Sequence, residues 1–121
     1  MVEHFDAVKA DMLQTGYVQN AATSSYNTID FGNNTTAFSW PGKDPNKQSL
    51  ISWREVSPGF LATAGMHLKK GRDFNRDAAS DSTHVIVKES VEKMMGVDNA
   101  VGKFLENNGR ADGKVTRYEI I

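Results

Sequence analysis

The chain has 121 residues, 39% hydrophobic and 24% charged, a composition typical of one globular domain. A net charge of −1 argues against a basic surface for nucleic acid. The absence of cysteine excludes disulfides, thiolate metal ligands and a cysteine nucleophile. No apolar run reaches the roughly 20 residues that a membrane-spanning helix requires.

Apolar residues recur at helical spacing within residues 2–13, and charged residues fill the other positions. This pattern predicts an amphipathic helix that ends at Gly16. Residues 17–25, rich in small side chains, predict a strand on which that helix packs. Residues 26–34 contain a glycine and three asparagines and predict a loop.

Two alternating segments predict a hairpin-like ribbon, with one strand over residues 35–40 and a returning strand over residues 50–56. Residues 41–46, PGKDPN, form a strong turn cluster between them. Trp40 and Trp53 flank this turn, and we expect both in the core or between two lobes.

Residues 56–74 predict the supersecondary unit around which the rest of the chain is organised. Ser57 is a favourable helix N-cap, and Pro58 fits the first helical position. Gly65 then ends a short helix in the left-handed conformation. Met66 and Leu68 alternate with polar residues, which predicts a short half-buried strand.

Three residues close this unit. Gly71 is expected to turn the chain at positive φ, and Phe74 to bury its ring. Arg72 carries five donors on a planar group, so we expect a structural clamp on loop carbonyls or a carboxylate, the alternative being a plain surface arginine. The basic cluster of residues 69–72 is expected to form a solvated rim.

The C-terminal half predicts a polar loop over 75–83, a strand over 84–87, a helix over 89–95 capped by Gly96, and strands over 101–105 and 115–121 joined by a loop at 107–113. The fold class is therefore predicted as α+β: mixed sheets with three short helices and about six strands, in one domain or two small lobes. Both ends resemble interior sequence, which predicts a piece excised from a longer protein.

One segment has the spacing of a metal site. Its candidate ligands are Asp73, Asn75, Asp77 and Asp81, which begin like an EF-hand calcium loop. The sixth position is Ala78 instead of glycine, and the twelfth is His84 instead of glutamate. We therefore expect a solvated acidic loop and no metal.

The chain shows no other catalytic or cofactor pattern. The three histidines lie far apart, and the sequence contains neither a G-x-S-x-G nucleophile elbow nor a glycine-rich phosphate loop. We expect no enzymatic activity and no cofactor.

The segment SPGFLATAGMHLKKGRDF, residues 57–74, resembles the signature of the extracytoplasmic core domain of MacB/FtsX-type ABC transporter permeases, in their Bacteroidetes-like branch. Other segments resemble the same family in the same order: WPGKDP at 40–45, HVIVKES at 84–90, MMG at 94–96, AVGK at 100–103 and YEII at 118–121. Lys88 replaces the family's usual asparagine, which departs from the pattern at that helix start.

The resemblance implies a MacB-like periplasmic core domain, with residues 1–121 as a single extracytoplasmic fragment of a longer membrane protein. That protein would be anchored by flanking helices on the periplasmic side of the bacterial cytoplasmic membrane and would work with a cytoplasmic ATPase. The domain would engage a substrate or a partner, such as a periplasmic adaptor or a cell-envelope protein, and transmit ATP-driven motion in export.

We single out seven residues as structural: Ser57, Pro58, Gly65, Gly71, Arg72, Phe74 and Gly102. A free-standing small ligand- or metal-binding module remains the alternative interpretation of the sequence.

Overall fold

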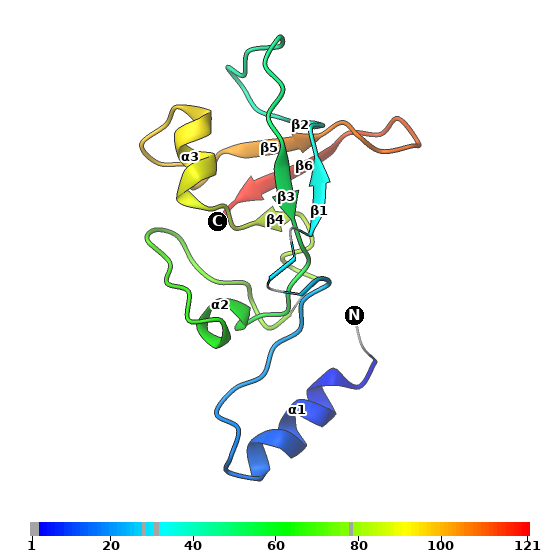
Figure 1. Ribbon diagram of the computed structural model, residues 1–121, viewed down its shortest axis with the longest axis vertical. Coiled ribbons are helices and arrows are strands. Elements are labelled where there is room, and N and C mark those ends of the chain that lie inside the picture. Colours follow the sequence, from blue (N-terminus) through cyan, green and yellow to red (C-terminus); the bar gives the residue numbers. More distant parts are fainter. Residues whose placement is uncertain (1–2, 28, 31, 78) are drawn as a thin grey trace.

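The computed structural model describes residues 3–27, 29, 30, 32–77 and 79–121, and these form an α+β fold (Figure 1). The elements, in chain order, are α1 (Phe5–Gln14), β1 (Asn33–Thr35), β2 (Phe38–Ser39), β3 (Ile51–Trp53), α2 (Phe60–Thr63), β4 (His84–Val85), α3 (Glu89–Met95), β5 (Phe104–Asn107) and β6 (Thr116–Ile120). The predicted class of mixed sheets with a few short helices is confirmed.

The strands form two sheets. The larger has the order β2-β5-β6-β4, in which every pair is antiparallel except β6 with β4. The smaller is the antiparallel ribbon of β1 and β3, which crosses the larger sheet in Figure 1. Consequently β6 is an interior strand, with neighbours on both sides.

The hydrophobic core combines residues of both sheets with the turn before β5. Its buried members are Phe38, Trp40, Ile51, Ala100, Leu105 and Ile120. Met95 of α3 and Val85 of β4 pack against this cluster and are partly buried. Trp40 therefore lies in the core as expected, whereas Trp53 is 36% exposed on the ribbon.

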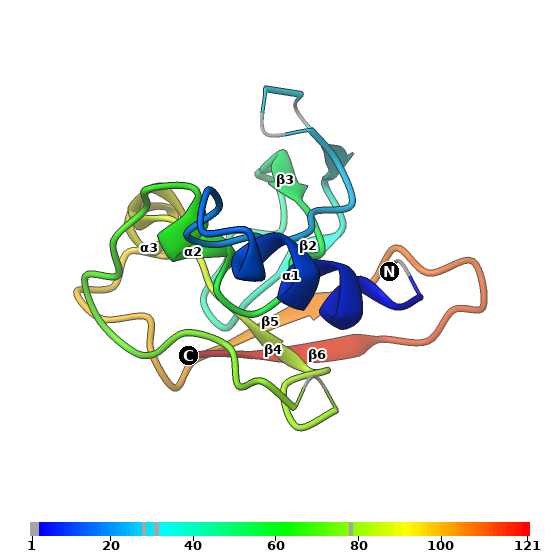
Figure 2. The ribbon, with the colours of Figure 1, turned by 90° about the horizontal axis from the view of Figure 1, so that it is seen from below.

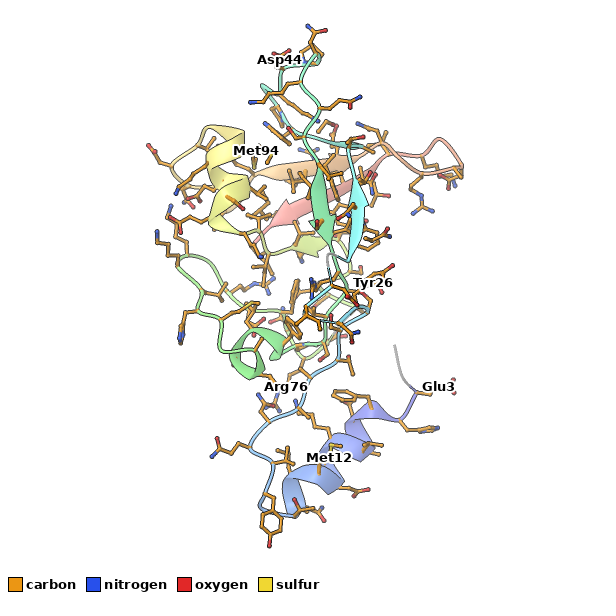
Figure 3. All side chains as sticks on the ribbon, in the orientation of Figure 1. Glu3, Met12, Tyr26, Asp44, Arg76 and Met94 are labelled. Carbon is orange, nitrogen blue, oxygen red and sulfur yellow. The ribbon has the colours of Figure 1, made fainter. Side chains whose placement is uncertain are left out.

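Helix α1 lies apart from this core in Figure 1, at one end of the molecule, and therefore overlaps the sheets when the molecule is seen from below in Figure 2. It matches the predicted helix over 2–13 closely, although residues 1 and 2 lie outside the described residues. None of its residues is buried, and Val8 and Met12 are 47% and 44% exposed. Figure 3 shows Met12 on this separate helix, away from the sheets.

The predicted strand over residues 17–25, and the packing of α1 on it, are wrong. Only Ser24 pairs, through an isolated antiparallel bridge with Val56. Tyr17 is 95% exposed, and the Asn20 side chain accepts a hydrogen bond from the Ala21 amide, a local alternative to strand pairing. The segment therefore has no regular surface on which a helix could pack.

The predicted ribbon is confirmed only in part. Of the predicted strand over 35–40, only Thr35 pairs with β3, opposite Ile51, and the ribbon extends back to Asn33, within the segment predicted as a loop. Phe38 instead pairs with Asn107 of β5, so the chain changes sheets at residues 36 and 37. The predicted turn at 41–46 is present: the Lys43 amide donates to the Trp40 carbonyl at 3.1 Å.

In the C-terminal half, α3 and its left-handed cap Gly96 are confirmed. The strands are shorter or displaced relative to the prediction: β4 covers two residues, and β5 begins at Phe104 because residues 101 and 102 form a turn. Gly102 has φ +81°, and its amide donates to the Ile120 carbonyl at 2.8 Å. No helix among the described residues has the length and apolarity needed to span a membrane.

Candidate functional site

Ser57 positions the start of the predicted unit, but not as a helix cap. Its Oγ accepts a hydrogen bond from the Thr23 amide at 2.9 Å, and its own amide donates to the Thr23 carbonyl at 3.0 Å. Gly59, at φ +80°, is the N-cap of α2. This left-handed residue lies between Pro58 and the helix, so the predicted roles of Ser57 as N-cap and of Pro58 as first helical residue are wrong.

The end of α2 follows the prediction. Gly65 has φ +69°, the Met66 amide donates to the Leu61 carbonyl at 2.8 Å, and the Gly65 amide donates to Ala62 at 3.1 Å. These are the two bonds of a Schellman cap. The predicted strand at residues 66–68 is wrong, because the segment has no partner strand and its apolar side chains are exposed.

The chain then passes the end of β6. Gly71, at φ +80°, packs against Ile121. Phe74 is half-buried instead of fully buried. Residue 71 therefore turns the chain at positive φ, as expected, at a point of contact with the larger sheet.

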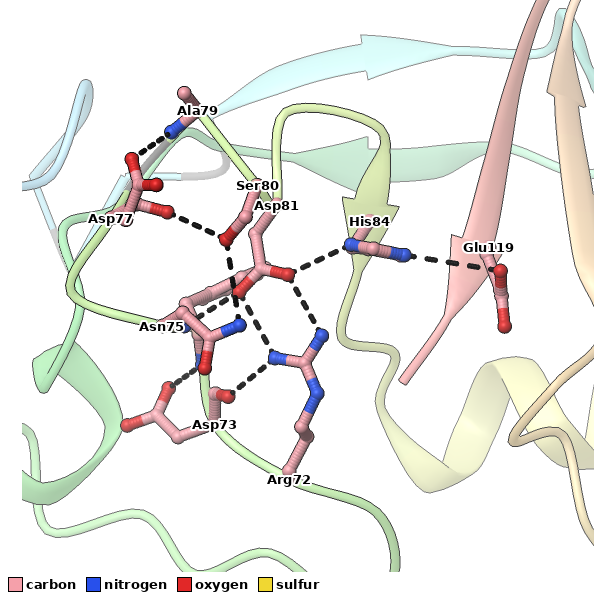
Figure 4. A network of polar contacts seen from close by, with 10 residues as sticks. Arg72, Asp73, Asn75, Asp77, Ala79, Ser80, Asp81, His84 and Glu119 are labelled. Carbon is pink, nitrogen blue, oxygen red and sulfur yellow. Dashed lines mark hydrogen bonds and ion pairs between the residues drawn. The ribbon is translucent and has the colours of Figure 1, made fainter.

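Arg72 and Asp81 form the centre of a polar network (Figure 4). The guanidinium donates from Nη2 to Asp81 Oδ1 at 2.8 Å and from Nη1 to Oδ2 at 3.0 Å. Nη1 also donates to the Asp73 carbonyl at 3.0 Å. The Asp81 side chain is only 3% exposed, so this two-pronged pair holds a buried carboxylate.

Asp81 has two further partners. The Asn75 amide donates to Oδ2, and His84 Nδ1 lies 2.8 Å from Oδ1. An ionised carboxylate offers about four acceptor sites, and all four are engaged here. The Arg72 hydrogen bonds, followed by the Asn75 amide and His84, hold the pKa of Asp81 well below its usual range.

The network continues into the sheet through His84. The parallel register of β4 and β6 places His84 opposite Glu119. His84 Nε2 lies 3.8 Å from Glu119 Oε2. Polar contacts thus run from the irregular segment at Arg72, through Asp81 and His84, to both strands.

The same contacts bear on the calcium hypothesis. Asp73 and Asp77 accept hydrogen bonds from backbone amides of their own loop, and Asp81 is paired with Arg72. A guanidinium within the cluster repels a cation. The described residues hold no group of three or more His, Asp or Glu placed to bind a metal; Ala78, the sixth loop position, lies outside them.

A second set of charges ties this segment to α3. Lys69 Nζ lies 2.7 Å from Glu89 Oε1, and Lys70 Nζ lies 3.2 Å from Glu92 Oε1. Lys70 also donates to the Asp98 carbonyl. The basic residues are exposed, as expected of a solvated rim, and each lysine also has a specific acidic partner.

The segments that carry the family resemblance meet at the end of β6. The Ile121 amide donates to the Val85 carbonyl at 3.1 Å, and Gly71 packs on Ile121 from another side. The Gly102 amide donates to the Ile120 carbonyl. The side chains of Ile120 and Trp40 belong to the same buried core cluster. The segments brought together are 40–45, 57–74, 84–90, 100–103 and 118–121.

Sequence reasoning singled out Arg72 but not its partner Asp81, nor His84 and Glu119, which extend the network from Asp81. Asp81 lies nine positions after Arg72, a spacing with no helical or strand meaning. The only local signal is the three-residue spacing of Asp81 and His84. No protein-family model, no curated protein and no solved structure matches this chain.

Proposed function

We propose that this chain is an extracytoplasmic domain of a MacB/FtsX-type ABC transporter permease, located on the periplasmic side of a bacterial cytoplasmic membrane. In this proposal the domain engages an exported substrate or a partner protein of the cell envelope. It transmits motion that a cytoplasmic ATPase generates and carries out no chemistry of its own.

One observation carries the proposal: five of the six segments that resemble this family, spread over residues 40–121, meet around the end of β6. Backbone hydrogen bonds join the segments of Val85 and Gly102 to the end of β6. The segments of Gly71 and Trp40 contact the same region through packing.

The polar network supports the mechanical part of the proposal. Because all acceptor sites of Asp81 are engaged, the carboxylate is suited to hold two parts of the chain together and not to exchange protons with a substrate. A fully hydrogen-bonded buried carboxylate makes a stiff joint. Transmission of force requires a rigid connection of this kind between the irregular segment and the sheet.

The parent gene provides the first test. We expect an apolar run of about 20 residues on each side of residues 1–121. A reading frame that encodes only these residues would overturn the proposal and favour the free-standing module.

The second test uses the full transporter. Arg72→Ala should impair export while the partner ATPase still binds ATP, because the change loosens the joint without reaching the nucleotide site. Arg110→Ala is the matched control, since Arg110 pairs with Asp112 inside its own loop. Equal export by both variants would contradict a role of the network in transmission.

A further inference from the structure

Residues 65–75, here called the strap, connect α2 to the turn before β4 without a helix or strand of their own. The backbone amides of residues 67–73 donate no hydrogen bond to any other described residue. Irregular segments of this kind, with unbonded backbone, open at lower free energy than the body of a fold.

Apolar burial also holds the strap only weakly. Met66 and Leu68 are 45% and 39% exposed, and Phe74 is half-buried. A strap fixed by hydrophobic packing would bury these side chains, so another interaction must hold it in place.

That interaction is charge. Three basic residues of the strap each face a different acidic residue of the body: Lys69 with Glu89, Lys70 with Glu92, and Arg72 with Asp81. The acidic partners become more buried along this series, with side-chain exposures of 51%, 20% and 3%. The strap is therefore held most weakly near Gly65 and most firmly at Arg72.

We propose that the strap is an electrostatic latch, which opens as a unit from α3 and the end of β6 while the sheet stays folded. Gly65 provides the hinge, since it has φ +69° and no atom within 4 Å of its Cβ direction. Opening uncovers Ile121 and Asp81, both buried in the closed form. This inference stands on the contacts alone; the open form is a minor state, and the proposed function concerns the closed form, in which Arg72 holds Asp81.

Limited trypsin digestion of the 121-residue chain tests the latch, because cleavage after Lys69, Lys70 or Arg72 requires the strap to leave the body. The digestion is run at ionic strengths of about 0.01 M and 1 M, where the Debye length is about 30 Å and 3 Å. We expect cleavage in the strap to rise about two- to fivefold at high salt, relative to cleavage after Lys47 as an internal reference, an exposed residue in no ion pair among the described residues. An unchanged ratio would overturn the proposal.

Variants that retain every trypsin site can distinguish opening of the latch from a general effect of salt on cleavage. Glu92→Gln removes the charge that faces Lys70 while its side-chain oxygen can still accept the Ala100 amide. We expect it to raise strap cleavage at low salt and to reduce the effect of added salt. Asp112→Asn is the control, because it removes an ion pair of similar exposure outside the strap and should leave strap cleavage unchanged.

Hydrogen exchange measured by mass spectrometry distinguishes local opening from global unfolding. The amides of β5 and β6 should stay protected at high salt while strap cleavage rises. If protection of β5 and β6 falls in parallel with strap cleavage, the strap does not open independently and the proposal is wrong.

Discussion

Gly71 and Ile121 approach so closely that no side chain fits between them: a Cβ on Gly71 would lie 2.6 Å from the carbonyl carbon of Ile121 and 2.8 Å from its oxygen. Both of these atoms belong to backbone, which cannot move aside as a flexible side chain can. The strap and the end of the larger sheet are therefore fitted to each other at this point.

Gly71→Ala should lower the melting temperature more than Gly65→Ala does. Both glycines have positive φ, which costs a side chain on the order of 1 kcal/mol. Only Gly71 adds a clash with backbone, since nothing lies within 4 Å of a Cβ on Gly65. Thermal unfolding of the two variants measures the difference, and equal melting temperatures would show that the contact with Ile121 relaxes freely.

Arg72→Ala should destabilise the isolated chain. It should also make the free energy of unfolding depend less on pH in acid. The folded pKa of Asp81 is depressed, so its carboxylate stabilises the fold above the unfolded pKa of about 4, and this contribution is lost as the pH falls further. Without Arg72 the pKa is depressed less. Urea unfolding from pH 7 down to pH 2 should therefore show a lower free energy of unfolding at pH 7 and a smaller decline in acid. A decline as steep as that of the parent would contradict the assignment.

Ser57→Ala should reduce the free energy of unfolding by about 1–3 kcal/mol, because it leaves the part-buried Thr23 amide without its acceptor. The control is Ser82→Ala, at an exposed turn position whose hydroxyl makes no hydrogen bond among the described residues, and it should change stability by less than about 0.5 kcal/mol. Chemical denaturation of both variants checks this. If the Ser57 variant is as stable as the Ser82 variant, the bond to Thr23 contributes nothing net.

Val8→Ser in α1 should leave the thermal transition of the core unchanged, since no residue of this helix is buried. Leu105→Ala, by contrast, removes a core side chain that is 4% exposed and should cost about 2–5 kcal/mol. Near-ultraviolet circular dichroism, which follows the core residue Trp40, reports this transition. Substantial destabilisation by Val8→Ser would mean that α1 packs on the body in solution.

The features that sequence predicted correctly are those set by neighbouring residues. Gly65 and Gly96 were identified as left-handed caps because a glycine after an apolar helical face is a local signal. The turn at 41–46 is likewise encoded by its own proline, glycine and asparagine. These elements depend little on the rest of the chain.

The errors concern partners that lie far away in sequence. Residues 17–25 and 66–68 alternate suitably for strands, but a strand exists only where another strand is available to pair with it. The Ser57 hydroxyl could accept a hydrogen bond either from an amide of the helix that follows or from a distant amide. In the fold the Thr23 amide lies next to it, so the hydroxyl accepts from Thr23. The residue type of Arg72 indicated a carboxylate or carbonyl partner, but nothing in the spacing identified Asp81 as that carboxylate.

The position of β6 has a consequence for how a nascent chain acquires this structure. It follows the other described strands in the chain, yet it lies between β5 and β4 in the larger sheet. Until residues 116–120 leave the ribosome, β4 has no partner and Ile120 is missing from the core. Chains that stall before this point would expose unpaired strands and apolar surface, the state in which proteins aggregate or recruit chaperones.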